Sequence, residues 1–307
     1  MLTVTGLTKR YGEIKAVDGL SFEVPKGICF GLLGPNGAGK TTTISMIAGT
    51  VDPDGGDVTL DGVSVAQRSA EAKQRIGYVP QELAIYEDLS AIANLHFFGA
   101  LYGLFGADCD RAIDRVLEVV GLADRAREPV KRFSGGMKRR LNIAVGLLHD
   151  PELMIFDEPT VGVDPQTRNA IFETLTALRE QGKTLIYTTH YMEEVERLCQ
   201  EVAIMDHGRI VAQGDLRTLK NSDSKVKEVS VYLHGAIDLP SETAIPGVLN
   251  WNAEDTLLRF EMEDLGVSLA AALTFLCHNG AAIISVRTAE ASLEQIFLQA
   301  TGKSLRD

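Results

Sequence analysis

The segment 34–41, Gly-Pro-Asn-Gly-Ala-Gly-Lys-Thr, constrains this chain most, because it fits the phosphate-loop pattern G-x-x-x-x-G-K-[ST]. An apolar run at 28–33 precedes it and predicts a buried strand, and residues 42–48 predict a helix. Glycines let successive backbone N–H groups turn toward phosphate oxygens, and the helix N-terminus adds a partial positive charge. We expect Lys40 to reach the β- and γ-phosphates and the Thr41 hydroxyl to bind Mg²⁺. The candidate nucleotide-binding residues here are Gly34, Pro35, Asn36, Gly37, Ala38, Gly39, Lys40, Thr41 and Thr42.

The composition bounds the size and charge of the protein. Its 307 residues can form one large domain or two ordinary domains, each with a real core. The formal net charge of -12 disfavours sequence-independent binding to nucleic acid and docking on anionic lipid, because both depend on a basic surface. We therefore expect no nucleic-acid partner.

Signals for membrane insertion and secretion are not visible in the sequence. No run of about 20 apolar residues predicts a transmembrane helix, and residues 1–5 do not begin a signal peptide. The cysteines are scattered and form no C-x-x-C pair: Cys29, Cys109, Cys199 and Cys277. We expect reduced, mostly buried thiols and a cytoplasmic protein.

The chain divides into parts of different character. Residues 1–215 combine β-turn signals with apolar strands that alternate with helices, and residues from about 82 to 150 have mostly helical spacing. Apolar strands at 153–156 and 184–187, with a helix between them, predict a βαβ unit and hence a parallel sheet. The predicted fold class is therefore α/β: a phosphate-loop core of mixed sheet and helical subdomain.

The pattern of polar and apolar residues changes after residue 215. We expect a polar linker at 216–226 and a small C-terminal α+β domain at 227–307. The latter shows two segments with period-two alternation, then a helix, a strand and a closing amphipathic helix.

A pair of acids follows the apolar strand at 153–156. Asp157 is expected to hold Mg²⁺, directly or through water, and Glu158 to polarise the attacking water. The carboxyl end of a parallel strand is where such groups would stand beside a phosphate loop.

Further motifs carry a family resemblance. The segment 133–137, Phe-Ser-Gly-Gly-Met, resembles the signature of ABC-type ATPases, usually LSGGQ or LSGGM. Gln81 resembles the glutamine of the family's Q-loop, and the segment 161–164 resembles its D-loop. His190 looks like the switch histidine, and Tyr11 like the aromatic residue that stacks on adenine.

These motifs stand in the family order and cover residues 1 to about 215. The departures are small: Phe133 and Val163 replace the usual leucines and stay apolar. The resemblance therefore implies an ABC ATPase core with no catalytic position degraded.

The resemblance also implies roles for single residues. Tyr11 offers a π-face to the base, and Gln81 binds Mg²⁺ or its water through a neutral side-chain oxygen. His190 is expected to orient the γ-phosphate rather than to act as the general base. Together with Lys40 and Glu158, His190 completes the expected catalytic set, and the expected metal ligands are Thr41, Gln81 and Asp157.

The signature is a second anion site, because Ser134, Gly135 and Gly136 would begin a helix. One phosphate loop cannot easily use both sites. The resemblance implies that two copies pair head-to-tail, so that the signature of one closes over the ATP of the other. Asp164 would then help to organise the contact between the two copies.

Two classes of function compete at this point. The first is the ATP-hydrolysing subunit of an ABC-type export system, with ATP and Mg²⁺ as cofactors, in which closure of a homodimer powers export through a separate membrane subunit. The second is a soluble ABC-type ATPase in translation or DNA repair. The repair type has a long coiled coil between phosphate loop and signature, and the translation type usually has two ATPase domains per chain. This chain has neither feature, so the first class is preferred.

Two segments favour the exporter class. The segment 83–98 is rich in apolar and aromatic residues and resembles the groove that receives a coupling helix from a membrane subunit. The segment 292–302 resembles the end of ATPases from drug-resistance and ABC-2 exporters. We thus expect a separate permease partner for drug, lipid, polysaccharide or ion export, and a peripheral location on the cytoplasmic face of the membrane.

Overall fold

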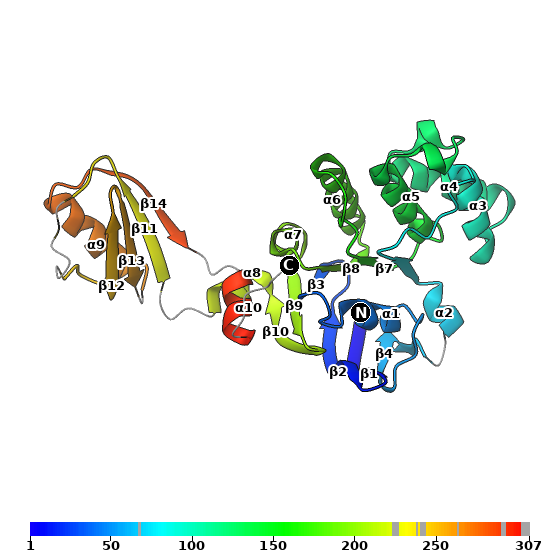
Figure 1. The fold of residues 1–307 in the computed structure, drawn as a ribbon, viewed down its shortest axis with the longest axis horizontal. Helices are drawn as coiled ribbons and strands as arrows, with labels where there is room; N and C mark the ends of the chain where they lie inside the picture. Colours follow the sequence, from blue (N-terminus) through cyan, green and yellow to red (C-terminus); the bar gives the residue numbers. More distant parts are fainter. Residues whose placement is uncertain are drawn as a thin grey trace. The chain divides into compact units, whose positions relative to one another are not determined.

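The computed structural model describes residues 1–66, 69–222, 227–237, 239, 244–262, 264–289 and 293–301. Two compact units make up the chain (Figure 1). The first contains residues 1–216 together with the part of the final helix from residue 297, and the second begins at residue 217 and ends at residue 296.

A six-stranded sheet in the order β10-β9-β3-β8-β7-β6 forms the centre of the first unit. Its strands are β3 (Cys29–Leu33), β6 (Ile76–Val79), β7 (Leu153–Asp157), β8 (Thr184–Thr189), β9 (Glu201–Asp206) and β10 (Arg209–Asp215). All neighbours are parallel except β9 and β10, which pair antiparallel. Strands β3, β7 and β8 are buried throughout, as is typical of parallel strands covered on both faces. The predicted βαβ unit is confirmed, with α6 (Pro165–Glu180) joining β7 to β8.

A second, antiparallel sheet has the order β2-β1-β4-β5. Its strands are β1 (Leu2–Tyr11), β2 (Ile14–Val24), β4 (Gly55–Leu60) and β5 (Val63–Ser64). One hydrophobic core joins this sheet to β3 and to α1 (Lys40–Ile47). Phe22 of β2 stacks on Phe30 of β3 with ring centroids 5.3 Å apart. This shared core fixes the start of the phosphate loop, because β3 leads directly into it.

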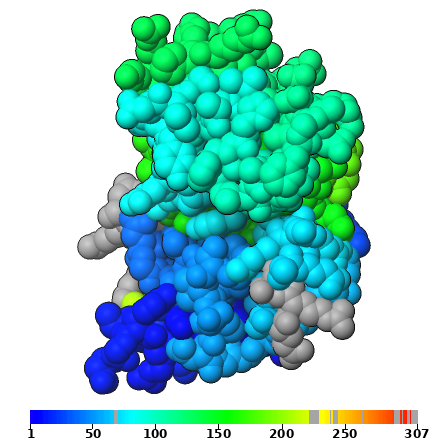
Figure 2. Space-filling view, turned by 90° about the vertical axis from the view of Figure 1, so that its right-hand side faces the viewer, coloured from blue at the N-terminus to red at the C-terminus, as the bar shows by residue number. Residues whose placement is uncertain are grey.

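Helices fill the region between β6 and β7, as the sequence predicted. They are α3 (Ala91–Leu101), α4 (Gly106–Val119) and α5 (Gly135–Leu147), with the 3-10 turns η1 (Ala123–Arg125) and η2 (Val130–Arg132) between α4 and α5. Ser90 caps α3 by accepting a hydrogen bond from the Ala93 N–H at 3.2 Å. Figure 2 shows this helical region, coloured cyan to green, as a lobe next to the blue amino-terminal strands.

Short helices flank strands of the six-stranded sheet. The helix α2 (Ser69–Lys73) precedes β6, α7 (Met192–Leu198) lies between β8 and β9, and α8 (Leu216–Ser222) follows β10. Among the described residues, no helix combines the length and the apolar character needed to cross a membrane. The thiols are mostly buried, as expected, with Cys277 the exposed exception.

The second unit contains a four-stranded antiparallel sheet in the order β12-β13-β11-β14. Its elements are β11 (Lys227–Leu233), β12 (Asn250–Glu254), β13 (Leu257–Met262), α9 (Val267–His278) and β14 (Ile283–Ala289). The predicted alternation is seen in its core, where Val229, Val231, Leu258 and Phe260 are buried together with Leu276 of α9. The α+β character expected for this part is confirmed.

The boundaries between the parts differ from the expectation. The segment expected as a linker at 216–226 begins as α8, and its residues 223–226 lie outside the described residues. The closing helix α10 (Leu293–Thr301) is divided between the units at residue 297, whereas the sequence assigned residues 227–307 to one domain. An amphipathic stripe predicts a helix but does not specify which core buries it.

Candidate functional site

The phosphate-loop segment has the predicted strand–loop–helix setting. It joins β3 to α1, and Gly39, with φ of 99°, stands at the N-cap of α1. A Cβ at Gly34 would lie 2.4 Å from the Met205 carbonyl oxygen, and one at Gly39 would lie 2.3 Å from that of Ala16. Only glycine fits these two positions, because the backbone of β2 and β9 packs directly against the loop.

Lys40, the first residue of α1, is only 5% exposed. Its Nζ donates to the carbonyl oxygens of Gly34 at 2.8 Å and of Pro35 at 3.2 Å, and lies 3.1 Å from Glu158 Oε1. The ammonium is thereby held within the loop, where a phosphate group would replace the carbonyl and carboxylate oxygens around it.

Asp157 ends β7 and lies against the first turn of α1. Its Oδ1 accepts hydrogen bonds from Thr188 Oγ1 at 2.8 Å and from Thr41 Oγ1 at 3.3 Å. Burial raises the pKa of this carboxyl, and the two hydroxyl donors act in the opposite direction. A hydroxyl and a carboxylate beside a phosphate loop are the oxygen ligands that suit Mg²⁺, which usually keeps several waters and substrate oxygens.

Glu158 is 6% exposed and brings the three predicted catalytic residues together. While Oε1 faces Lys40, its Oε2 lies 3.3 Å from His190 Nδ1. Its backbone has φ of 44°, and its N–H donates to the Thr188 carbonyl and hydroxyl. This left-handed conformation turns the Glu158 side chain from the end of the strand toward Lys40 and His190.

Gln81 lies two residues beyond β6, at the edge of the sheet where Asp157 ends β7. Its side chain is exposed, but its backbone carbonyl accepts a hydrogen bond from Arg139 Nη1 at 2.7 Å. The same nitrogen donates to the Pro80 carbonyl at 3.0 Å, and Asn142 Nδ2 donates to that carbonyl at 3.3 Å. Arg139 and Asn142 are on α5, so the predicted signature helix is tied to the predicted Q-loop.

The signature residues begin α5, as predicted. Ser134 is its N-cap, and its Oγ accepts from the Met137 N–H at 3.2 Å. Ser134 and Gly135 are exposed, and no atom lies within 4 Å of a Cβ built at Gly135. Figure 1 shows α5 within the helical region, apart from α1. The structure therefore does not bring the signature to the phosphate loop of the same chain.

Asp164 and Tyr11 occupy local positions that leave them accessible. Asp164 caps α6, because its carboxylate accepts from the Thr167 N–H at 3.0 Å and hydroxyl at 2.7 Å. These bonds lower the pKa of Asp164. Tyr11 ends β1 with half of its surface exposed, and Lys9 Nζ lies 5.8 Å from the centre of its ring.

Some polar residues around the site were not singled out from the sequence. Thr188 holds both Asp157 and Glu158, and Arg139 holds the predicted Q-loop. Glu194 is buried and accepts a hydrogen bond from the hydroxyl of Thr189, the residue before His190. Thr188 could have been noticed as a polar residue in an apolar strand, but Glu194 is one of several acids in a polar segment and gives no such signal.

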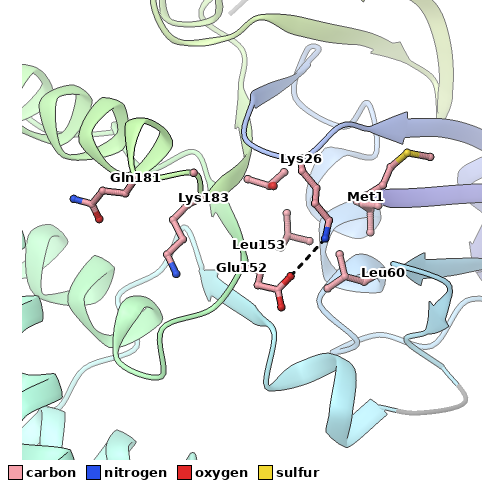
Figure 3. A pocket seen from close by; sticks show the side chains of 10 residues that line it. Met1, Lys26, Leu60, Glu152, Leu153, Gln181 and Lys183 are labelled. Carbon is pink, nitrogen blue, oxygen red and sulfur yellow. Dashed lines mark ion pairs between the residues drawn. The ribbon is translucent and has the colours of Figure 1, made fainter.

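A different pocket lies at the opposite ends of β7 and β8, where Leu153 and Thr184 begin these strands (Figure 3). Lys26 Nζ lies 2.7 Å from Asp61 Oδ2 and 4.0 Å from Glu152 Oε2, and Lys183 Nζ lies 2.8 Å from Asp150 Oδ1. Because both of its lysines are matched by acids, this pocket does not resemble a phosphate site.

Comparisons with known proteins agree with this geometry. Residues 17–161 match the family model described as ABC transporter. The chain is 44% identical to the linearmycin resistance ATP-binding protein LnrL of Bacillus subtilis, over the full length of both proteins. It is 40% identical to the Nod factor export ATP-binding protein I of Ralstonia nicotianae, covering 100% of this chain and 95% of the relative.

Solved structures show the same fold. The structure of an ATP-binding subunit of an ABC transporter superposes with a TM-score of 0.65 at 31% identity, covering 72% of this chain and 92% of the other. A dimeric bacterial ABC transporter cassette superposes with a TM-score of 0.64 at 25% identity, covering 71% and 99%. Because relatives over its full length and the family model both match, the chain belongs to the ABC transporter family, as one of its ATP-binding and ATP-hydrolysing proteins.

Proposed function

We propose that this protein is the ATPase of an ABC-type export system and works at the cytoplasmic face of the membrane with a separate permease. Family membership and the names of its relatives, which include a resistance protein and Nod factor export proteins, support this proposal. The comparisons offer no support for the alternative of a soluble ATPase in translation or DNA repair.

The observation that carries the catalytic assignment is the cluster of Lys40, Glu158 and His190. Lys40 would bind the β- and γ-phosphates, Glu158 would accept a proton from the attacking water, and His190 would orient the γ-phosphate. Thr41, Asp157 and Gln81 would hold Mg²⁺, whose charge would offset that of the phosphates.

Replacement of Lys40 tests this assignment. Lys40→Ala is expected to lower ATP affinity or turnover by at least about a hundredfold, because a buried charge that contacts phosphate is lost. Lys183→Ala is the matched control, because Lys183 pairs with Asp150 beyond the far end of the sheet. Unchanged hydrolysis by purified Lys40→Ala would refute the assignment.

We further propose that two copies close head-to-tail around ATP. The support is geometric: Ser134 and Gly135 form an exposed helix N-terminus that their own phosphate loop does not use. A structural relative at 25% identity is described as dimeric. A second copy would supply the phosphate that this helix end can bind, and Asp164 would stand near the contact.

The permease is proposed to dock on an aromatic cluster of the helical region. Tyr86 and Phe97 are exposed and meet edge to face at 5.0 Å, and Phe98 packs against Phe97 at 5.3 Å. Exposed aromatic groups of this kind are typical of protein interfaces. Phe97→Asp should abolish copurification of a membrane protein with the tagged ATPase, whereas Phe105→Asp, an exposed residue outside the cluster, should not. Equal recovery with both variants would place the permease elsewhere.

A further inference from the structure

Glu194, on α7, is a buried carboxylate with no part in the proposed chemistry. Its side chain is almost wholly buried and accepts three hydrogen bonds from hydroxyl groups. Tyr187 Oη and Thr189 Oγ1 donate to Oε2 at 2.9 and 2.7 Å, and Thr160 Oγ1 donates to Oε1 at 2.7 Å. Each of these three donors belongs to another segment of the chain. Together they define the position of the carboxylate.

Two of these donors lie beside the proposed catalytic residues. Thr189 directly precedes His190, and its Oγ1 also accepts from the Tyr191 N–H at 3.0 Å, so hydrogen bonds fix the chain on both sides of His190. Thr160 follows Glu158 by two residues, in a turn that the Val161 N–H closes on the Glu158 carbonyl at 3.2 Å. Glu194 thereby ties the chain around His190 to the turn after Glu158.

A cation from a third segment completes the arrangement. Arg168 Nε, in the first turns of α6, lies 3.7 Å from Glu194 Oε1, and the Arg168 guanidinium lies 5.6 Å from the centre of the Tyr191 ring. Transferring a carboxylate from water to the protein interior costs free energy. Apolar residues of equal volume often stabilise a core equally well. Packing alone therefore does not explain a carboxylate at this position.

We propose that Glu194 is a positioning residue for ATP hydrolysis, which holds His190 through Thr189 and the turn after Glu158 through Thr160. The inference rests on the proposed roles of Glu158 and His190. Without the carboxylate, Thr189 and Thr160 lose their common acceptor, and His190 no longer keeps a fixed distance from Glu158.

Glu194→Gln tests this proposal with little change in volume. The amide presents a donor where the carboxylate accepts, so the hydroxyl groups cannot all keep their bonds. We expect kcat to fall by about tenfold to a hundredfold, because small displacements of reacting groups have effects of this size. The Kd for Mg-ADP should change by less than about twofold, because Glu194 does not contact the phosphate loop.

Two further variants separate positioning from stability. Thr189→Val keeps the volume and removes the hydroxyl that donates to Glu194 and accepts from the Tyr191 N–H, so the same selective loss of kcat is expected even if Glu194→Gln folds poorly. Leu117→Ala opens a cavity in α4 and should lower the melting temperature while kcat, measured below that temperature, stays unchanged. An equal loss of kcat in Leu117→Ala would show that instability alone explains the effect and would overturn the proposal.

A double-mutant cycle with His190 decides the mechanism. If Glu194 acts by fixing the distance between His190 and Glu158, Glu194→Gln in a His190→Ala background should slow turnover by less than about threefold beyond His190→Ala alone. Losses that multiply, or a Glu194→Gln protein with unchanged kcat, would overturn the inference. Wild-type kcat in His190→Ala alone would instead refute the proposed role of His190, which is a distinguishable failure.

Discussion

Lys40 and Glu158 form a buried ion pair, with 3.1 Å between Nζ and Oε1 and less than a tenth of either side chain exposed. The pair joins the residue that would bind phosphate to the residue that would activate water. A carboxylate at this distance competes with phosphate oxygens for the ammonium group, because both are anions in a site of low dielectric.

Glu158→Gln should therefore bind Mg-ADP more tightly than the wild type, by at least about threefold, because the neutral amide competes less for Lys40. Isothermal titration calorimetry with ADP measures this effect without hydrolysis. Glu152→Gln, which changes a carboxylate just before β7 at its other end, is the matched control and should leave affinity unchanged. Weaker ADP binding by Glu158→Gln would contradict the competition.

Gly135→Ala tests the role of the signature without changing the phosphate loop. Open space surrounds a Cβ at this position, so the melting temperature and the ADP affinity should stay at wild-type values. Turnover should fall by at least about tenfold, because the methyl group stands where a phosphate of the second copy would approach the helix N-terminus. Full ATPase activity of Gly135→Ala in a steady-state phosphate-release assay would exclude a role of this helix end.

Arg139→Met tests the link between α5 and the Q-loop. The carbonyls of Pro80 and Gln81 would lose a charged donor, so we expect a higher apparent KM for Mg²⁺ and a stability loss of about 1–3 kcal/mol. Arg140→Met is the matched control on the same helix, because Arg140 donates to the carbonyls of Val120 and Gly121 instead. The link has no role in Mg²⁺ binding if both variants shift the KM for Mg²⁺ equally.

His149 should make stability depend on pH. Burial lowers the pKa of His149 below its usual 6.5, and its Nδ1 is buried with no hydrogen-bond partner, while Nε2 contacts the Ile76 carbonyl at 3.1 Å. The unfolded chain therefore binds a proton more readily than the folded one, and stability falls as the pH drops through 6.5 toward the folded pKa.

His149→Gln should reduce the slope of unfolding free energy against pH between about pH 7 and pH 5. Urea unfolding at several pH values measures it. An unchanged slope in His149→Gln would show that His149 takes up no extra proton on unfolding.

The sequence predicted the elements of the site better than their contacts. The order of Lys40, Glu158 and His190 along the chain placed each at the end of a strand or the start of a helix, and the parallel sheet then brings all three to one edge. Their mutual distances depend on Thr188 and on the left-handed backbone at Glu158, which no local pattern specifies.

The sequence also did not predict which residues form hydrogen bonds with partners far away along the chain. Arg139 meets the Pro80 and Gln81 carbonyls from nearly sixty residues away, and Glu194 meets Thr160 from 34 residues away. Neither pairing follows a periodicity, because each depends on how α5 and α7 pack against the sheet. The division of the closing helix α10 between the units escaped prediction for the same reason.

Two copies are proposed to close around ATP, with the signature of one over the phosphate loop of the other. Size-exclusion chromatography with light scattering of Glu158→Gln, with and without Mg-ATP, tests it directly. We expect a dimer with Mg-ATP and a monomer when Gly135→Ala is added to the same protein. A Glu158→Gln protein that binds ATP with full affinity and stays monomeric would contradict it.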